Sequence, residues 1–199
     1  MKTTLLLILL AICSSFASAD PIIFTNQYGS VTVNTFGIQS TQSELTSFDG
    51  IKPTKGALGY VNYGTGALVS GSIADGGTFS SQGSYFDITG VGKGVPHGAI
   101  FTGEFVGPIS WVNDGASGLH DNNLRFTLSG DLEGTLYNGR MVSGFTSQTI
   151  YSTNGQLSQG IGHIQTGISK LTAPEPNEML LFGSGIIGIA GMVKRKISA

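Results

Sequence analysis

The sequence predicts an all-β protein, and we expect an antiparallel β-sandwich, with a barrel as the second choice. Short apolar stretches alternate with Gly, Ser, Thr and Asn, and no stripe with the 3.6-residue helical period runs through residues 20–172. Turn signals recur about every 8 to 12 residues, a spacing typical of sandwiches and barrels. This length suits one domain, since domains commonly have roughly 100 to 150 residues.

The expected strands are short runs with alternating or β-branched side chains, bounded by turn residues. In chain order they cover residues 22–25, 30–38, 58–63, 67–73, 78–79, 84–89, 99–106, 109–112, 124–128, 132–137, 141–151 and 160–168. Gly64-Thr65-Gly66 and Ser129-Gly130-Asp131 are interpreted as hairpin turns. Asn138-Gly139 is the strongest hairpin signal, because both residues accept the positive φ of a type I′ turn.

Large aromatic side chains are expected to supply much of the core, each contributing roughly 1.5–3 kcal/mol when fully buried. They are Phe79, Phe86, Phe101, Phe105, Trp111, Phe126 and Phe145. The chain has 10 Lys and Arg against 12 Asp and Glu, and the body contains no basic patch. Nucleic acid is therefore not expected as a partner.

The N-terminus has the pattern of a secretory signal peptide. Lys2 gives a positive start, residues 5–12 are apolar, and Ala17-Ser18-Ala19 forms a small-x-small cleavage site. The mature chain is expected to begin at Asp20 after passage through the Sec export machinery. Cys13, the only cysteine, follows Ile12 rather than the small residue of a lipobox, so we expect no lipid anchor. It leaves with the signal peptide, so the mature domain has no disulfide.

The C-terminus has three parts in order. Pro174-Glu175-Pro176 is followed by an apolar run at 179–193 and by the basic cluster Lys194-Arg195-Lys196. As a helix the run would reach about 22 Å, short of a hydrocarbon core of about 30 Å. The basic cluster is expected on the cytoplasmic side of the membrane. A simple C-terminal membrane anchor without processing is the alternative interpretation of this tail.

This tail, residues 173–199, resembles the PEP-CTERM sorting signal of Gram-negative bacteria. The resemblance implies recognition by an exosortase, a membrane-embedded protease or transpeptidase, after transient anchoring in the inner membrane through the apolar helix. It also implies a final location in the cell envelope, on the outer surface or outside the cell, and an association with extracellular polysaccharide. The resemblance is confined to the tail and says nothing of the body.

No convincing catalytic, cofactor or metal site is found in the body. His97, His120 and His163 lack zinc-ligand spacing. Asp131 and Glu133 would share one strand face and could act as an acid–base pair on a glycosidic bond, yet a solvated strand edge is the simpler interpretation. Glu104 is expected to face water.

Two further groups of residues offer binding chemistry. Residues 114–118 and 120–123 form an oxygen-rich loop that suits calcium, although turn chemistry explains the same residues. A sugar-stacking platform is the second possibility, and core or half-buried positions are the simpler interpretation of the same aromatic residues. The platform would comprise Tyr60, Tyr63, Tyr85, Trp111, Tyr137 and Tyr151.

The sequence thus favours a non-enzymatic, exported β-domain of the cell envelope or extracellular matrix. The alternative is a carbohydrate-binding module or a carbohydrate-active enzyme of the cell surface.

Overall fold

The computed structural model describes residues 21–116, 123–153 and 156–168, and these residues form antiparallel β-strands joined by turns and loops. The predicted signal peptide and the predicted tail, with its apolar helix, lie outside the described residues. Within the described part of the chain, we find no helix of the length and apolarity that crossing a membrane requires.

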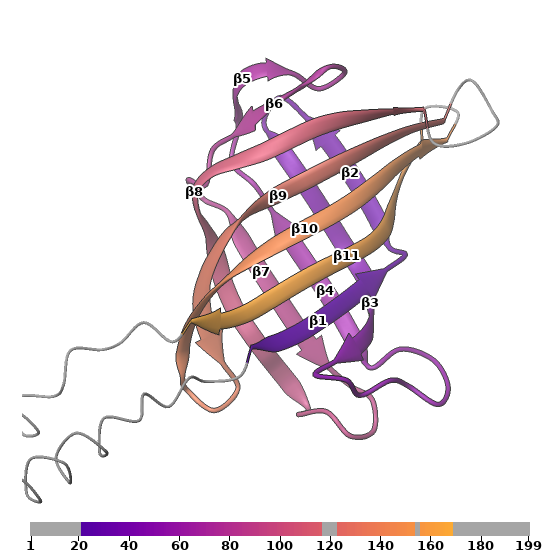
Figure 1. The fold of residues 1–199 in the computed structure, drawn as a ribbon, viewed down its shortest axis with the longest axis vertical. Helices are drawn as coiled ribbons and strands as arrows, with labels where there is room; N and C mark the ends of the chain where they lie inside the picture. The colour runs from indigo at the N-terminus through magenta and orange to yellow at the C-terminus, as the bar shows by residue number, and fades with distance from the viewer. Residues whose placement is uncertain (1–20, 117–122, 154–155, 169–199) are drawn as a thin grey trace, which may run out of the picture. The chain divides into compact units, whose positions relative to one another are not determined.

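Eight strands close into an antiparallel barrel (Figure 1). Their order around the barrel is β1, β3, β4, β7, β8, β9, β10, β11, and β11 pairs with β1 to close it. They are β1 (Ile22–Gln27), β3 (Gly37–Phe48), β4 (Gly59–Gly64), β7 (Tyr85–Gly90), β8 (Gly98–Ala116), β9 (Asn123–Leu136), β10 (Met141–Thr153) and β11 (Gln156–Ile168).

Three further strands extend this barrel along its length. β2 (Ser30–Asn34) continues the path of β1 and pairs with β3 and, at Ser30, with β11. β5 (Leu68–Ser72) and β6 (Gly76–Phe79) form a hairpin, and β6 pairs with β8 beyond the end of β7. The chain thus winds up and down around the barrel in sequence order.

The all-β prediction is confirmed, but the preferred sandwich is not what forms. The pairing of β1 with β11 joins the first and last strands, and β8 pairs with both β7 and β9. Closure of this kind gives the eight strands partners on both sides, whereas a sandwich leaves edges that must be protected. The second choice, a barrel, is the architecture observed.

Several predicted strand boundaries are wrong. Residues 30–38 form a hairpin, not one strand: β2 turns at Thr35–Phe36 into β3, most of which was not predicted. Gly64-Thr65-Gly66 is no hairpin turn, because β4 pairs with β7 and β5 pairs with β6. Ser129-Gly130-Asp131 lies inside the continuous strand β9. The Asn138-Gly139 hairpin is confirmed as the connection of β9 to β10, but the predicted type I′ turn is wrong, because Gly139 has a positive φ and Asn138 does not.

Six of the seven predicted core aromatics are buried: Phe79, Phe86, Phe101, Phe105, Trp111 and Phe126. Phe145 is the exception, with 48% of its surface exposed. Val142 and Ile150 of the same strand point inward, and side chains alternate along a strand, so Phe145 must point outward. Phe24 and Phe48 are buried aromatics that the sequence pattern did not predict; their rings meet edge to face at 5.1 Å.

The two ends of the described chain lie side by side. Ile22, at the start of β1, pairs with Thr166, near the end of β11. The β2–β3 hairpin lies at the far end of the same strand path, because β1 and β2 run in one direction from Ile22 to Asn34. At roughly 3.3 Å per residue, this path is about 40 Å long.

Candidate functional site

The residues predicted to direct sorting all lie outside the described residues. They are Ala17 and Ala19 at the signal cleavage site, Pro174, Glu175 and Pro176 of the triplet, and Lys194, Arg195 and Lys196 of the basic cluster. Their roles stay predictions. The last described strand, β11, ends at Ile168, two residues beyond the Ile22–Thr166 pair.

The histidines and carboxylates considered from the sequence do not form a metal-binding group in the described part of the chain. His97 and His163 are both exposed, and His120 lies outside the described residues. Asp131 and Glu133 share the outer face of β9, on either side of the buried Leu132. Glu104 is exposed, as predicted, and is directly opposite Glu133 across the β8–β9 ladder.

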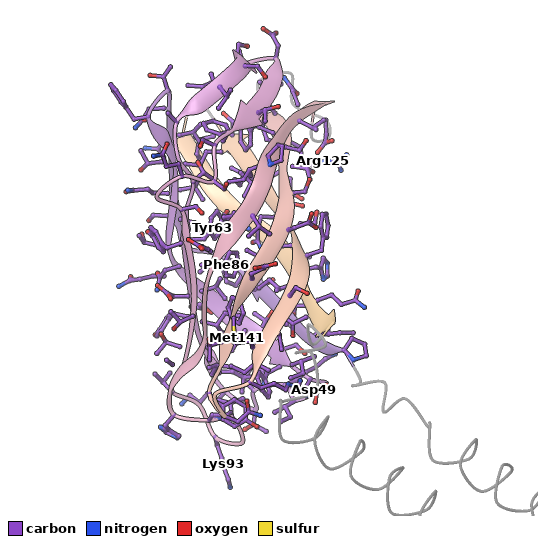
Figure 2. The ribbon with its side chains drawn as sticks, turned by 90° about the vertical axis from the view of Figure 1, so that its left-hand side faces the viewer. Asp49, Tyr63, Phe86, Lys93, Arg125 and Met141 are labelled. Atoms are coloured by element: carbon purple, nitrogen blue, oxygen red, sulfur yellow. The ribbon has the colours of Figure 1, made fainter. Side chains whose placement is uncertain are left out.

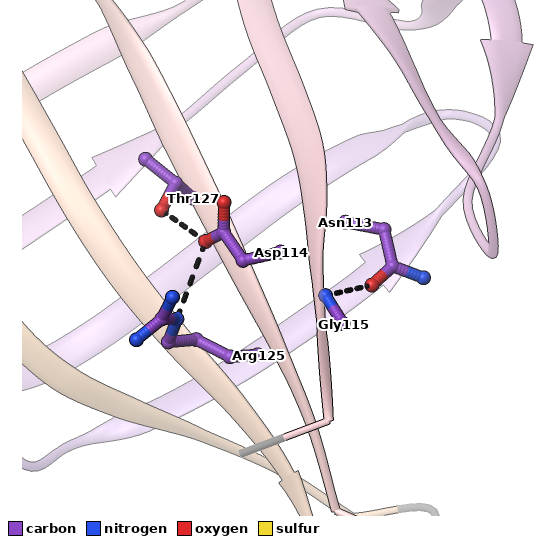
Figure 3. A network of polar contacts seen from close by, with 5 residues as sticks. All are labelled: Asn113, Asp114, Gly115, Arg125 and Thr127. Atoms are coloured by element: carbon purple, nitrogen blue, oxygen red, sulfur yellow. Dashed lines mark hydrogen bonds and ion pairs between the residues drawn. The ribbon is translucent and has the colours of Figure 1, made fainter.

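The structure describes part of the oxygen-rich loop, and the Asp114 carboxylate in this part contacts Thr127 and Arg125 (Figure 3). Asp114 Oδ2 accepts a hydrogen bond of 2.6 Å from Thr127 Oγ1 and lies 3.5 Å from Arg125 Nε. Asn113 Oδ1 accepts from the backbone N–H of Gly115, which is turn chemistry. Residues 117–122 lie outside the described residues, so calcium binding by this loop stays a hypothesis beside the turn interpretation.

The six aromatic residues considered as a sugar platform are not brought together. Tyr63 and Trp111 are buried in the barrel. Tyr60 is exposed on β4, and Tyr137 is exposed just beyond the end of β9. Two strands, β7 and β8, separate β4 from β9 in the strand order. The rings of Tyr85 and Tyr151 cover glycines on neighbouring strands, Gly64 and Gly160, where an added Cβ would meet them at 2.5 Å. These rings therefore have structural partners.

A buried polar network inside the barrel is the principal group that sequence reasoning missed. Asn26 Nδ2 donates to Ser43 Oγ at 2.8 Å and to Gln148 Oε1 at 3.0 Å. Gln159 Nε2 donates to the same Gln148 oxygen at 3.1 Å, and Gln148 Nε2 donates to Thr146 Oγ1 at 2.8 Å. These side chains come from β1, β3, β10 and β11 and are buried.

Tyr63 connects this network to the aromatic part of the core. Its hydroxyl donates to Gln159 Oε1 at 2.7 Å, and its ring stacks on Phe86 with centroids 5.5 Å apart; Figure 2 shows both rings within the barrel. Burial raises the pKa of Tyr63 far above its ordinary value. The nearby Ser40 hydroxyl lowers the pKa of Tyr63, but by less than burial raises it. No atom lies in hydrogen-bond geometry with Ser40 Oγ.

The network's chemistry is structural. Gly162 lies against it so closely that an added Cβ would lie 2.0 Å from Gln148 Oε1 and 2.4 Å from Asn26 Oδ1. Amides and hydroxyls of this kind neither accept protons readily near neutral pH nor act as nucleophiles without an activating base. Its hydrogen bonds connect β1 with β3 and β10, and β11 with β10.

The sequence signal for the network is a weak one. Asn26, Gln148 and Gln159 sit in stretches rich in Ser, Thr and Gln on both strand faces, so alternation of apolar and polar residues does not mark the inward positions. Comparison of the chain with protein-family models, with curated proteins and with solved structures found no match.

Proposed function

We propose that the protein is an exported, non-enzymatic β-barrel domain of the cell envelope or extracellular matrix, sorted by an exosortase-like system. The observation that carries the proposal is the pairing of a signal-peptide pattern before Asp20 with the triplet Pro174-Glu175-Pro176, the apolar run and the basic cluster after the body. The predicted partners are the Sec machinery and an exosortase-like membrane protease or transpeptidase. Extracellular polysaccharide is the expected surrounding polymer.

The barrel itself supports a role for its outer surface. The described interior is occupied by large side chains with almost no exposed surface, including Trp111, Tyr63 and Phe86. An eight-stranded barrel is just wide enough for side chains to fill it. A filled barrel presents its chemistry outward, which suits a displayed or matrix protein.

Intact-mass spectrometry of the protein isolated from its native cells tests the proposal. We expect a chain that begins at Asp20 and has lost the apolar run and basic cluster of the tail. A Glu175→Ala variant should retain its tail, while the matched Glu104→Ala variant, changed on the exposed outer wall, should be processed normally. A cytosolic protein with both termini intact would overturn the proposal.

A further inference from the structure

The tip of the β2–β3 hairpin carries an exposed aromatic ring beside a small polar hollow. Phe36 is 85% exposed, the most exposed of the described large hydrophobic side chains. The hollow encloses about 140 Å³ and is lined by Thr32, Asn34, Phe36, Gly37, Gln39 and Thr65. It lies at the end of the barrel opposite the Ile22–Thr166 pair.

The backbone around the hollow is fixed by local hydrogen bonds. Asn34 Oδ1 accepts from the N–H of Phe36 at 2.8 Å, which holds the turn and leaves the Asn34 Nδ2 hydrogens available. Gly37 has φ +151°, and an added Cβ would lie 2.6 Å from the Thr65 carbonyl oxygen. Only a glycine lets the hairpin pack this closely against residue 65.

The floor of the hollow is equally constrained. Thr65 is 8% exposed; its Oγ1 accepts from Ile38 N–H at 2.9 Å and donates to the Gly66 carbonyl at 2.9 Å. Thr32 and Gln39 are directly opposite each other in the β2–β3 ladder and are exposed on the same outer face. The hollow is thus pre-organised at its floor and turn, with amide and hydroxyl groups free at its rim.

We propose that this hollow binds one residue of a neutral saccharide chain. Amides offer both donors and acceptors, which match the hydroxyl groups of a sugar, and an aromatic face with its negative charge density attracts the C–H groups of a sugar ring. The lining contains no charged side chain, which favours a neutral sugar over an anionic one. A purely apolar partner would leave the amide groups of Asn34 and Gln39 without hydrogen bonds.

The choice of ligand rests in part on the proposed matrix function, because that function places the barrel among extracellular polysaccharides. The location of the hollow agrees with it. If the tail anchors or links the protein at the Ile22–Thr166 end, the hairpin projects at the other end, about 40 Å along the strands.

Ligand-observed NMR with defined oligosaccharides tests the proposal. The full chain, purified in a zwitterionic detergent whose head group contains no sugar, is titrated with neutral gluco-, galacto- and N-acetylglucosamine hexasaccharides and with an oligogalacturonate. We expect at least one neutral hexasaccharide to bind and the anionic one to bind more weakly. Phe36→Ala should weaken binding at least tenfold, and Phe36→Trp should preserve it.

Matched variants distinguish binding in the hollow from binding elsewhere on the barrel. Phe145→Ala removes a different exposed ring on the outer wall and should leave binding unchanged. Gln39→Ala should weaken binding without changing the thermal unfolding midpoint, because Gln39 is exposed. Failure of every neutral sugar to bind, or equal binding by Phe36→Ala and the unaltered protein, overturns the proposal.

Self-association that depends on protein concentration and is abolished by Phe36→Ala would also overturn the saccharide proposal. It would mean that a second copy of the chain occupies the hollow. Sorting is measured separately, through tail processing, so a failed sugar titration with normal processing rejects the hollow alone. Normal sugar binding with both termini intact rejects the sorting proposal alone.

Discussion

The barrel interior has two unlike walls. Phe86, Phe101 and Phe105 come from β7 and β8 and pack ring against ring, with centroids 5.7 to 6.4 Å apart. The wall built by β1, β3, β10 and β11 includes amides and hydroxyls that bond one another, among them Asn26 and Gln148. We call these the aromatic wall and the polar wall.

The two walls differ in what they specify. Apolar packing is non-directional, and cores tolerate rearrangement when volume is kept. Hydrogen bonds between buried amides are directional, and a displaced partner leaves an unpaired group at a cost of about 1–3 kcal/mol. The polar wall lies where the first and last strands meet, so Asn26 and Gln148, 122 residues apart, can bond only after closure. We infer that the aromatic wall supplies most of the stability and the polar wall fixes the closing register.

The largest effect is expected in the aromatic wall. Phe86 contacts Tyr63, Phe101 and Phe105, so Phe86→Ala leaves a cavity at the centre of this cluster. We expect the free energy of unfolding to fall by about 3–5 kcal/mol. Phe145→Ala, the same substitution on the outer face, should change it by less than about 0.5 kcal/mol. Urea denaturation of both variants measures the difference, and equal losses would contradict the assignment of the two faces.

A smaller loss is expected in the polar wall. Gln148→Met keeps a similar side-chain volume but removes the acceptor of Asn26 and Gln159 and the donor to Thr146. We expect a loss of about 1–3 kcal/mol in the free energy of unfolding. Gln165→Met, at an exposed position of β11, is the control and should lie within about 0.5 kcal/mol of the unaltered protein.

Gln148→Met also tests the assignment of register. If the polar wall fixes the closing register, amide hydrogen exchange should accelerate in β1 and β11 more than in β7 and β8. Uniform acceleration over all strands would contradict a specific role in closure.

The sequence was informative where inward positions were apolar. Phe101 and Phe105 alternate with polar residues in β8, and Asn138-Gly139 marks a hairpin by its backbone chemistry, so both features were predicted. β3 was missed because two of its inward residues are Ser40 and Ser43, which look like loop residues in a one-dimensional pattern.

Other errors have a common cause in contacts between distant segments. Gly130 was interpreted as part of a turn, but it is buried in β9, where an added Cβ would meet the Phe105 ring at 3.0 Å. The choice of barrel over sandwich depends on the β1–β11 pairing, which joins segments more than a hundred residues apart. The hollow beside Phe36 is formed by a hairpin that begins within residues 30–38, which were predicted as a single strand.

Tyr63 belongs to both walls, so its hydroxyl gives the smallest and most specific test at neutral pH. Tyr63→Phe keeps the ring stacked on Phe86 and removes the bond to Gln159, at a cost of about 1 kcal/mol. The pH dependence adds a second readout. Because burial raises the pKa of Tyr63, the folded protein keeps its proton above about pH 10, where an unfolded tyrosine loses it. The stability that the protonated Tyr63 hydroxyl contributes is therefore complete below pH 10. Above pH 10 the free energy of unfolding declines by up to about 1.4 kcal/mol per pH unit.

Urea unfolding of the unaltered protein and of Tyr63→Phe between pH 8 and pH 11.5, from about two units below to about one and a half units above the ordinary tyrosine pKa, measures this difference. We expect the stability of the unaltered protein to fall more steeply above pH 10 than that of Tyr63→Phe, so that the two curves converge and then cross before pH 11.5. Tyr137→Phe removes a hydroxyl from a ring that is 55% exposed and should leave the steep decline in place. Parallel curves for the unaltered protein and Tyr63→Phe would mean that the Tyr63 hydroxyl reaches solvent, and the polar wall would then be open to water at its junction with the aromatic wall.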